Sequence, residues 1–158
     1  MPRSTDLHPN LAAFLDMLAA SEIGPDLMEK TDDGYNVLAG ATPNHPLTFS
    51  SYATHPNILN TRCDSTASGR YQLLHRYYSP YCILLGLTDF SPISQDKIAI
   101  QQIKECHAIP DILAGNLQES IHLCNHLWAS LFGSPYGQHT NSIEYLQAAY
   151  TKSGGVLA

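Results

Sequence analysis

Glu22 is the residue of this chain best placed to act as a general acid. It follows Leu18 by one helical turn, at the end of a predicted amphipathic helix whose apolar side includes Leu11 and Phe14. A carboxyl group half-buried against apolar surface resists ionisation and can hold a proton near neutral pH. An exposed glutamate at a helix end is the commoner arrangement, and position alone favours that interpretation over a catalytic one.

A glycosidase usually pairs its acid with a second carboxylate that serves as nucleophile or base. Four candidates follow Glu22, and nothing in their spacing selects one of them: Asp26, Asp32, Asp33 and Asp64. A reaction with a single carboxylate is also open, in which the C6 hydroxyl of the sugar attacks its own anomeric carbon. That route closes an anhydro ring and needs no nucleophile from the enzyme.

Two short segments carry groups that suit N-acetyl sugars. Tyr71 and Gln72 follow Gly69, which permits close backbone approach, and they supply an aromatic face and an amide. Tyr136 and Gln138 repeat this chemistry on either side of a glycine later in the chain. Both combinations are common in proteins, so neither predicts a sugar site by itself.

The histidines suggest a metal site only weakly. His122 and His126 are four residues apart and would share one face of a helix, but the glutamate of a zinc-protease motif is missing and no third ligand is evident. Two surface histidines are the preferred interpretation. We expect no metal and no cofactor, and no nucleophile-elbow pattern indicates a serine hydrolase.

The periodicity of apolar residues predicts an α+β protein with a mostly helical body. Residues 25–68 are rich in Gly, Pro, Asn, Ser and Thr and read as a loop-rich lobe with small strands near 35–38 and 47–49. The expected helices cover residues 11–21 with Asn10 as N-cap, a stretch from Gly69 that Pro80 breaks or kinks, a stretch from Ser91-Pro92 that Pro110 ends, residues 117–131, and a last helix carrying Ile143 and Tyr150. We expect one domain over residues 1–158, with a substrate cleft between the body and the lobe.

Composition narrows the class of protein further. The 158 residues are 44% hydrophobic and 14% charged, which is typical of a folded soluble domain. A net charge of -6 with 8 Lys+Arg argues against a nucleic-acid partner. No apolar run is long enough to span a membrane, and no secretory signal is visible, so we expect the four cysteines to be reduced thiols.

Read in order, several segments resemble the endolysin family of bacteriophage lambda and its relatives. The resemblance covers roughly residues 11–155 and rests on FLDMLAASE (14–22), GYNVLAG (34–40), THPN (54–57), STASGRYQLL (65–74), LGLTDFSPISQD (85–96), QQIKE (101–105), WASLFGSPYGQ (128–138) and a final GG (154–155). The chain departs from the family at Ile23-Gly24, where Gly-Thr is usual, in residues 25–33, and at Phe132 and Pro135.

The resemblance implies a lysozyme-like fold and a lytic transglycosylase activity on peptidoglycan. Such an enzyme cleaves the MurNAc–GlcNAc β-1,4 bond without water and leaves 1,6-anhydromuramic ends. The resemblance assigns the catalytic acid/base to Glu22 and substrate contacts to Ser21, Tyr71, Gln72, Tyr136 and Gln138, with Trp128 in the core beneath the site. It further implies a monomer that accumulates in the bacterial cytoplasm, reaches the wall through a holin-type pore and does not insert into the membrane.

Two alternatives remain beside this reading. One is a hydrolytic muramidase or chitinase-like glycosidase on the same fold, with Asp64 or Asp33 positioning water. The other is a non-catalytic glycan-binding domain, which would have no need of a buried acid at Glu22. The acidic net charge is unusual for a protein that acts on the anionic bacterial wall.

Overall fold

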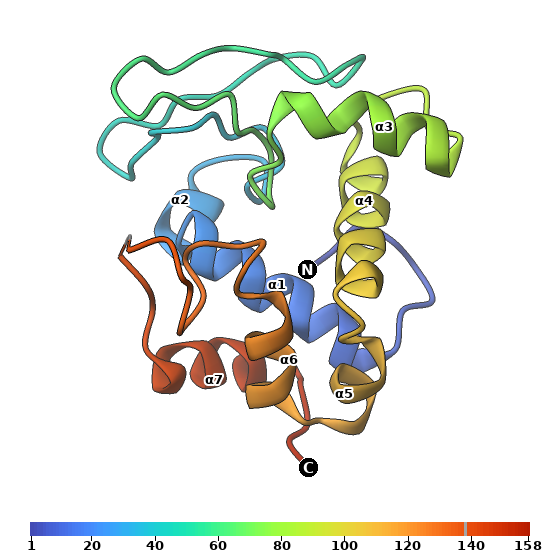
Figure 1. Ribbon diagram of the computed structural model, residues 1–158. Helices are drawn as coiled ribbons and strands as arrows, with labels where there is room; N and C mark the ends of the chain where they lie inside the picture. The colour runs from blue at the N-terminus through green and yellow to red at the C-terminus, as the bar shows by residue number, and fades with distance from the viewer. Residues whose placement is uncertain (138) are drawn as a thin grey trace. The chain divides into compact units, whose positions relative to one another are not determined.

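The computed structural model describes residues 1–137 and 139–158 and has seven helices within them. Their bounds are α1 Pro9–Glu22, α2 Pro25–Glu29, α3 His75–Leu85, α4 Pro92–Glu105, α5 Ile109–Ala114, α6 Leu117–Cys124 and α7 Ile143–Lys152. The chain forms two compact units: a terminal unit of residues 1–22 and 99–158, and an inner unit of residues 23–98. In Figure 1 the terminal unit joins the blue start of the chain to its orange and red end.

Helix α1 is the central element of the terminal unit. Ten of its 14 residues are buried, including Phe14, Leu15 and Leu18. It packs against α5 and α7, and α5 packs in turn against α6 (Figure 1). A helix covered on most sides needs few polar positions, which is why its apolar character extends beyond one stripe. Glu22 is the last residue of this buried helix.

Asn10 ties the start of α1 to the end of the chain. The predicted N-cap role is wrong, because α1 begins one residue earlier, at Pro9. The side-chain amide nitrogen of Asn10 donates to the carbonyl oxygens of Leu113 and Val156, at 3.3 and 3.2 Å. Its amide oxygen accepts from the backbone amide of Val156 at 2.9 Å. The C-terminal segment is therefore part of the terminal unit rather than a loose tail.

The inner unit contains less β structure than the sequence predicts. In place of strands near residues 35–38 and 47–49, the described residues form isolated antiparallel bridges such as Val37 with Thr48 and Leu38 with Ser68. Turn residues interrupt each pairing before a ladder can extend. The short helix α2 was not predicted; it begins at Pro25, a residue suited to the first turn of a helix.

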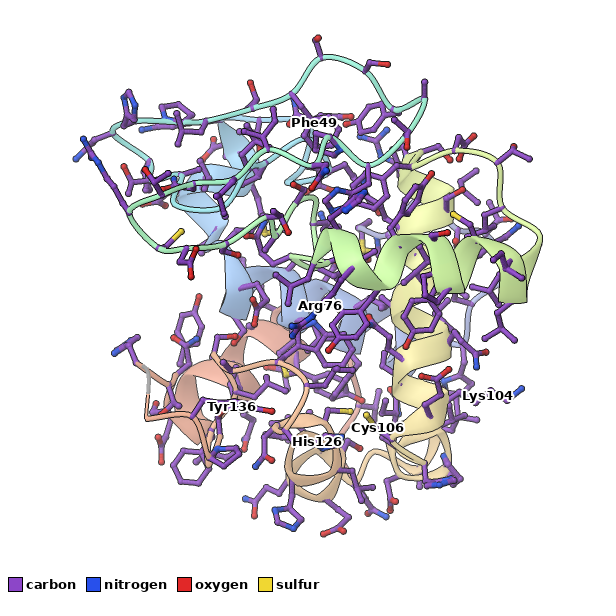
Figure 2. The ribbon with its side chains drawn as sticks, turned by 45° about the horizontal axis from the view of Figure 1, so that its top comes forward. Phe49, Arg76, Lys104, Cys106, His126 and Tyr136 are labelled. Atoms are coloured by element: carbon purple, nitrogen blue, oxygen red, sulfur yellow. The ribbon has the colours of Figure 1, made fainter. Side chains whose placement is uncertain are left out.

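An aromatic core holds the inner unit together. Its buried cluster consists of Phe49, Leu73, Tyr78, Phe90 and Ile98. The rings of Phe49 and Phe90 lie 6.1 Å apart between centroids, and Figure 2 shows Phe49 within this part of the molecule. The packing joins the loop-rich stretch to α3 and the first half of α4, so the unit extends beyond the predicted lobe, up to residue 98.

A buried polar cluster crosses the same unit. Asp96, which is fully buried, accepts hydrogen bonds at 2.7 Å from the hydroxyls of both Tyr35 and Tyr71. Arg70, also fully buried, pairs with the carboxylate of Asp33 at 2.8 Å and donates to its carbonyl oxygen. Its guanidinium carbon lies 5.2 Å from the centre of the Tyr35 ring. Charges at this depth are tolerable only when they are paired in this way.

Three predicted helix boundaries differ from the structure. The helix expected from Gly69 begins six residues later, at His75, and continues through Pro80 to Leu85. The helix that begins at Pro92, as predicted, ends at Glu105, and Pro110 lies in the first turn of α5. The predicted helix over residues 117–131 stops at Cys124, and turns carry the chain onward. Those turns still bury Trp128 and Leu131. Apolar residues at helical spacing can therefore be buried by turns as well as by a helix.

None of the helices in residues 1–137 and 139–158 is both long enough and apolar enough to cross a membrane.

Replacing Asp96 by Ala should lower the free energy of unfolding by about 2–5 kcal/mol, because two buried tyrosine hydroxyls lose their acceptor. Asp26→Ala is the matched control: Asp26 is exposed on α2 in the same unit, and its loss should cost less than about 1 kcal/mol. Urea unfolding of both variants measures the difference. Equal losses would contradict the structural role given to Asp96.

Candidate active site

Glu22 receives its hydrogen bond from a residue far along the chain. The hydroxyl of Ser130 lies 2.5 Å from the Oε1 atom of Glu22. Ser130 sits in the turns that follow α6, so the end of α1 and these turns meet inside the terminal unit. The Glu22 residue is half-buried. Glu22 is therefore not an isolated helix-end glutamate but the last member of a chain of hydrogen bonds that runs through Ser130.

The direction of this chain follows from Asn141. Its side-chain nitrogen contacts the carbonyl oxygens of Ser21 and Ser130 at 3.2 and 3.3 Å, and carbonyls only accept. The same nitrogen therefore donates to the hydroxyl of Ser21 at 3.0 Å. The hydroxyls of Ser21 and Ser130 lie 2.7 Å apart. When Ser21 donates to Ser130 and Ser130 donates to Glu22, every hydrogen points toward the carboxylate.

Two opposing effects act on the acidity of Glu22. Burial disfavours the charged carboxylate and raises the pKa above its usual value of 4.5. Hydrogen bonds from the hydroxyl and the backbone of Ser130 favour the carboxylate and lower the pKa, but burial is the larger effect. The Glu22 carboxyl is therefore a weaker acid than an ordinary glutamate. Its ionised form is still stabilised by hydrogen bonds that Ser130 donates. Both properties suit a residue that gives up a proton and takes one back.

The four candidate partner carboxylates all belong to the inner unit, not to the unit of Glu22. Asp33 is paired with Arg70, and Asp32 accepts a 2.6 Å hydrogen bond from the hydroxyl of Tyr52. Asp26 and Asp64 are exposed. Asp32 and Asp33 thus have structural engagements of their own, which a free nucleophile would lack.

Tyr71 and Gln72 differ in what they present to a ligand. The Tyr71 side chain is 5% exposed, its hydroxyl donates to Asp96, and burial raises its pKa well above the usual range. Its ring has almost no free face, so its contacts place it in the framework of the inner unit. Gln72 is half-buried with a left-handed backbone (φ 51°), and its amide nitrogen donates to the carbonyl oxygen of Gly69. Of the pair, Gln72 keeps the partial exposure that a sugar contact requires.

Tyr136 and Ser21 lie in the terminal unit. The Tyr136 side chain is 57% exposed, and its hydroxyl donates to the carbonyl oxygen of His126 at 2.7 Å (Figure 2). That hydrogen bond fixes the ring while leaving its faces open, as a stacking platform requires. Ser21 is buried, and its hydroxyl lies within hydrogen-bond distance of the Ser130 hydroxyl. Gln138 lies outside the described residues.

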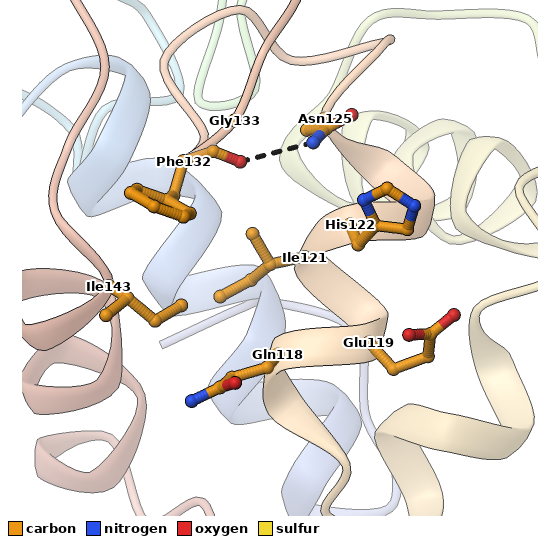
Figure 3. Close-up of a pocket in the computed structure, with 8 residues that line it drawn as sticks. All are labelled: Gln118, Glu119, Ile121, His122, Asn125, Phe132, Gly133 and Ile143. Carbon is orange, nitrogen blue, oxygen red and sulfur yellow. Dashed lines mark hydrogen bonds between the residues drawn. The ribbon is translucent and has the colours of Figure 1, made fainter.

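The turn after Ser130 is anchored from α6. The side-chain nitrogen of Asn125 donates to the carbonyl oxygen of Phe132 at 3.2 Å (Figure 3). Phe132 is exposed and borders a pocket of about 370 Å³ whose other lining residues include Ile121, His122 and Ile143. An asparagine side chain that binds backbone beyond the helix competes with further helical turns, which accounts for the early end of α6. The turn in turn holds Ser130 in place.

The two histidines considered as metal ligands are both exposed. Within residues 1–137 and 139–158, no three His, Cys, Asp or Glu side chains come together as a metal site would require.

Ser130 and Asn141 are the functional candidates that sequence reasoning missed. Ser130 lies within the WAS segment at residues 128–130, of which only Trp128 was singled out, as a core residue. Asn141 has no sequence signal, since it belongs to no periodic segment or known string. Their partner Glu22 is 108 residues before Ser130, and only the fold brings them together.

Comparison with known proteins identifies the family of this chain. The family model described as Endolysin matches residues 12–157. The endolysin of Escherichia phage P2 is 43% identical in an alignment of 159 residues that covers 96% of this chain and 96% of that protein. The endolysin of Escherichia phage lambda is 44% identical in an alignment of 149 residues that covers 92% of this chain and 91% of that protein. The chain belongs to the endolysin family.

Solved structures of the lambda protein show that the fold of this endolysin, as well as its sequence, is similar to that of its relative. Bacteriophage lambda lysozyme complexed with a chitohexasaccharide matches with a TM-score of 0.87 and 41% identity, covering 98% of this chain and all of that one. A second structure of lysozyme from bacteriophage lambda gives 0.83 and 40% over the same shares. The predicted lysozyme-like, mostly helical fold is therefore confirmed, and this endolysin is an enzyme of the lysozyme type.

Replacing Ser130 by Ala should raise the pKa of Glu22 further, because the carboxylate loses a donor while its burial remains. An acid that must be protonated loses activity as pH rises through its pKa, so the alkaline limb of the kcat/KM profile should move to higher pH. We also expect kcat to fall about tenfold as the carboxyl loses its fixed position.

The matched control is Ser120→Ala. Ser120 is buried in α6 of the same unit, and its hydroxyl bonds the carbonyl oxygen of Asn116. Its pH profile should keep the original alkaline limb. A Ser130 variant with an unshifted limb would contradict the role given to this hydrogen bond.

Replacing Glu22 by Gln should stabilise the protein at neutral pH. A carboxyl whose pKa is raised by folding holds its proton better in the folded state, so its contribution to stability falls as pH rises from 4.5 through the folded pKa. The neutral amide avoids that loss. The gain in free energy of unfolding should vanish below pH 4.5 and grow above it. Thermal unfolding of both proteins across this range measures it, and a pH-independent difference would contradict the raised pKa.

Proposed function

We propose that this endolysin is a peptidoglycan lytic transglycosylase that cleaves MurNAc-β-1,4-GlcNAc bonds, with Glu22 as general acid and then general base. The observation that carries the proposal is the buried Glu22 carboxyl at the end of a one-way chain of hydrogen-bond donors. Burial favours the protonated acid before the reaction, and the donors favour the carboxylate during it.

The reaction can be written with Glu22 alone. Its protonated carboxyl gives the proton to the glycosidic oxygen, and the bond between that oxygen and C1 of the MurNAc ring breaks. The C6 hydroxyl of the same MurNAc forms a new bond to C1, and its proton passes to the Glu22 carboxylate. The products are a free C4 hydroxyl on GlcNAc and a 1,6-anhydro ring, with no water consumed. Glu22 ends the cycle protonated, as it began.

The engagement of the inner-unit aspartates supports the water-free route over hydrolysis. In the hydrolytic alternative, Asp33 or Asp64 would position water, but Asp33 is held by Arg70 and by its place in the buried polar cluster. Asp64 is exposed, with a left-handed backbone (φ 48°) in a turn. Asp64 thus lacks the surroundings that Glu22 has, and the carboxylate of Asp33 is already engaged by Arg70.

Glycan strands of peptidoglycan are the proposed substrate. The lambda relative is solved with a chitohexasaccharide, a polymer of N-acetyl sugars, which supports a glycan substrate of the same chemistry here. The exposed ring of Tyr136 and the amide of Gln72 are the proposed contacts on this chain, with Gln138 retained from the sequence resemblance. Tyr71 and Ser21 are proposed to support these contacts within their own units, Tyr71 through Asp96 and Ser21 through Ser130.

The proposed setting is a phage or prophage lysis programme. We propose that the endolysin acts as a monomer, accumulates in the host cytoplasm and reaches the wall through a holin-type pore. The net charge of -6 predicts that its approach to an anionic wall depends on ionic strength, with salt relieving the repulsion.

Digestion of purified peptidoglycan, followed by mass spectrometry of the released muropeptides, tests the reaction type. We expect anhydromuramic ends, each lighter by one water than a reducing end. In 18O-labelled water these ends should carry no label. Reducing ends that contain 18O would overturn the transglycosylase assignment in favour of the hydrolase.

The same assay tests the role of Glu22. Glu22→Gln should lower the rate of release by about 10²–10⁴-fold, the range expected for loss of a general acid. Glu29→Gln is the control, since Glu29 is an exposed glutamate in α2 and should retain the parent rate. Wild-type activity in a folded Glu22 variant would sink the proposal.

A further inference from the structure

A pocket in the terminal unit lies apart from the residues assigned to the reaction. It is bordered by α6, the turn at residues 132–133 and the start of α7 (Figure 3). The described residues that line it do not include Glu22, Ser130 or Tyr136. Its volume of about 370 Å³ lies within the range of about 300–1,000 Å³ that small-molecule sites occupy. The pocket is therefore large enough to hold a ligand of its own.

Part of the pocket is aromatic and apolar. The Phe132 side chain is 51% exposed, at a position where the chain departs from its family. Asn125 fixes the turn that carries this ring, because its side-chain nitrogen donates to the Phe132 carbonyl oxygen at 3.2 Å. In the view of Figure 3 the ring and Ile143 lie on one side of the pocket, with Ile121 between them and α6. A fixed and exposed ring next to aliphatic side chains suits the apolar face of a sugar ring.

The remaining lining of the pocket is polar. Gln118 and His122 are exposed on one face of α6, and Asn125 follows on the same face just past its end. The amide of Gln118 both donates and accepts hydrogen bonds, and the side-chain oxygen of Asn125 accepts them. A ligand that uses both parts of the pocket needs hydroxyl or amide groups on an otherwise apolar ring. N-acetylated sugars combine these features.

The charge of the pocket distinguishes between the two sugars of peptidoglycan. The exposed carboxylate of Glu119 is part of the lining, and none of the described lining residues is Lys or Arg. MurNAc carries a lactyl carboxylate or, in the wall, an acidic stem peptide, whereas GlcNAc is neutral. A carboxylate of the ligand would be repelled by Glu119, with no lysine or arginine in the lining to offset the repulsion. The pocket therefore fits GlcNAc better than MurNAc.

We propose that this pocket is an accessory binding site for a GlcNAc ring of the glycan strand, with Phe132 as its stacking surface and Gln118 and Asn125 as its hydrogen-bond partners. The proposal rests on the glycan substrate proposed above and adds a second contact to it. Tyr136, a proposed glycan contact of the reaction site, follows Phe132 by four residues. One short segment thus presents an exposed aromatic ring to each site, and a strand bound at Phe132 stays on the enzyme when a product leaves the reaction site.

Isoleucine methyl NMR tests the site directly. Titration of the Glu22→Gln protein with N,N′,N″-triacetylchitotriose should shift the methyl signals of Ile121 and Ile143 saturably, while that of Ile112, buried in α5 of the same unit, stays in place. Phe132→Ala should weaken the binding that these two signals report about tenfold, because the stacking surface is lost. Phe132→Tyr and Tyr136→Ala are the matched controls and should leave it unchanged. Unmoved signals, or equal affinity in Phe132→Ala, would overturn the proposal.

Titrations with the single sugars GlcNAc and MurNAc at pH 8, where imidazole is neutral, test the assigned ligand. At the Ile121 and Ile143 signals, GlcNAc should bind several-fold more tightly than MurNAc, and Glu119→Gln should bring the two affinities together. Equal or tighter binding of MurNAc by the parent protein would overturn the assignment to GlcNAc. Failure of the proposed reaction would appear in the digestion products and leave these titrations unchanged, whereas unmoved signals in an active enzyme would remove the accessory site alone.

Discussion

The short hydrogen bond from Ser130 to Glu22 is the contact on which the proposed chemistry depends. It joins the end of a buried helix to a turn that comes 108 residues later. Much of the terminal unit keeps those two points together: α1 packs on α5 and α7, Asn125 anchors the turn, and Asn141 donates to both serines. A carboxyl poised between its two protonation states needs this precision, because a loose donor would leave burial unopposed.

The same contact makes the site costly to maintain. Keeping a carboxyl group in protein surroundings lowers stability wherever the group is ionised, and the donor chain offsets only part of that cost. The inner unit also holds carboxyl groups within the protein, but it gives them other partners. There, Asp96 and Asp33 are satisfied by tyrosine hydroxyls and by Arg70, and they act as framework. Carboxyls that are held by other protein groups thus have two proposed purposes in this chain, and their partners distinguish them.

Much of the helical framework could be predicted from sequence, because α1 and the last helix follow apolar spacing and α4 begins at the proline that signals its start. The end of α6 could not, since buried turns place Trp128 and Leu131 where a helix would also place them. The sequence singled out Glu22, and the resemblance gave it a role. Ser130 and Asn141 were missed because their importance lies in contacts across more than a hundred residues. The hydrogen bond from Tyr71 to Asp96 was also not predicted, because sequence does not reveal which aromatic rings have a buried acceptor.

The terminal unit is built from both ends of the chain, and this affects when the enzyme can become competent during its synthesis. Glu22 leaves the ribosome before its donor Ser130 and before Asn141, whose side-chain nitrogen donates to Ser21, because the inner unit lies between them in the chain. Val156, which locks Asn10 at the start of α1, comes later still. A nascent chain therefore carries its acid without the groups that tune it. The proposed site is therefore completed only after the whole inner unit, residues 23–98, has been synthesised.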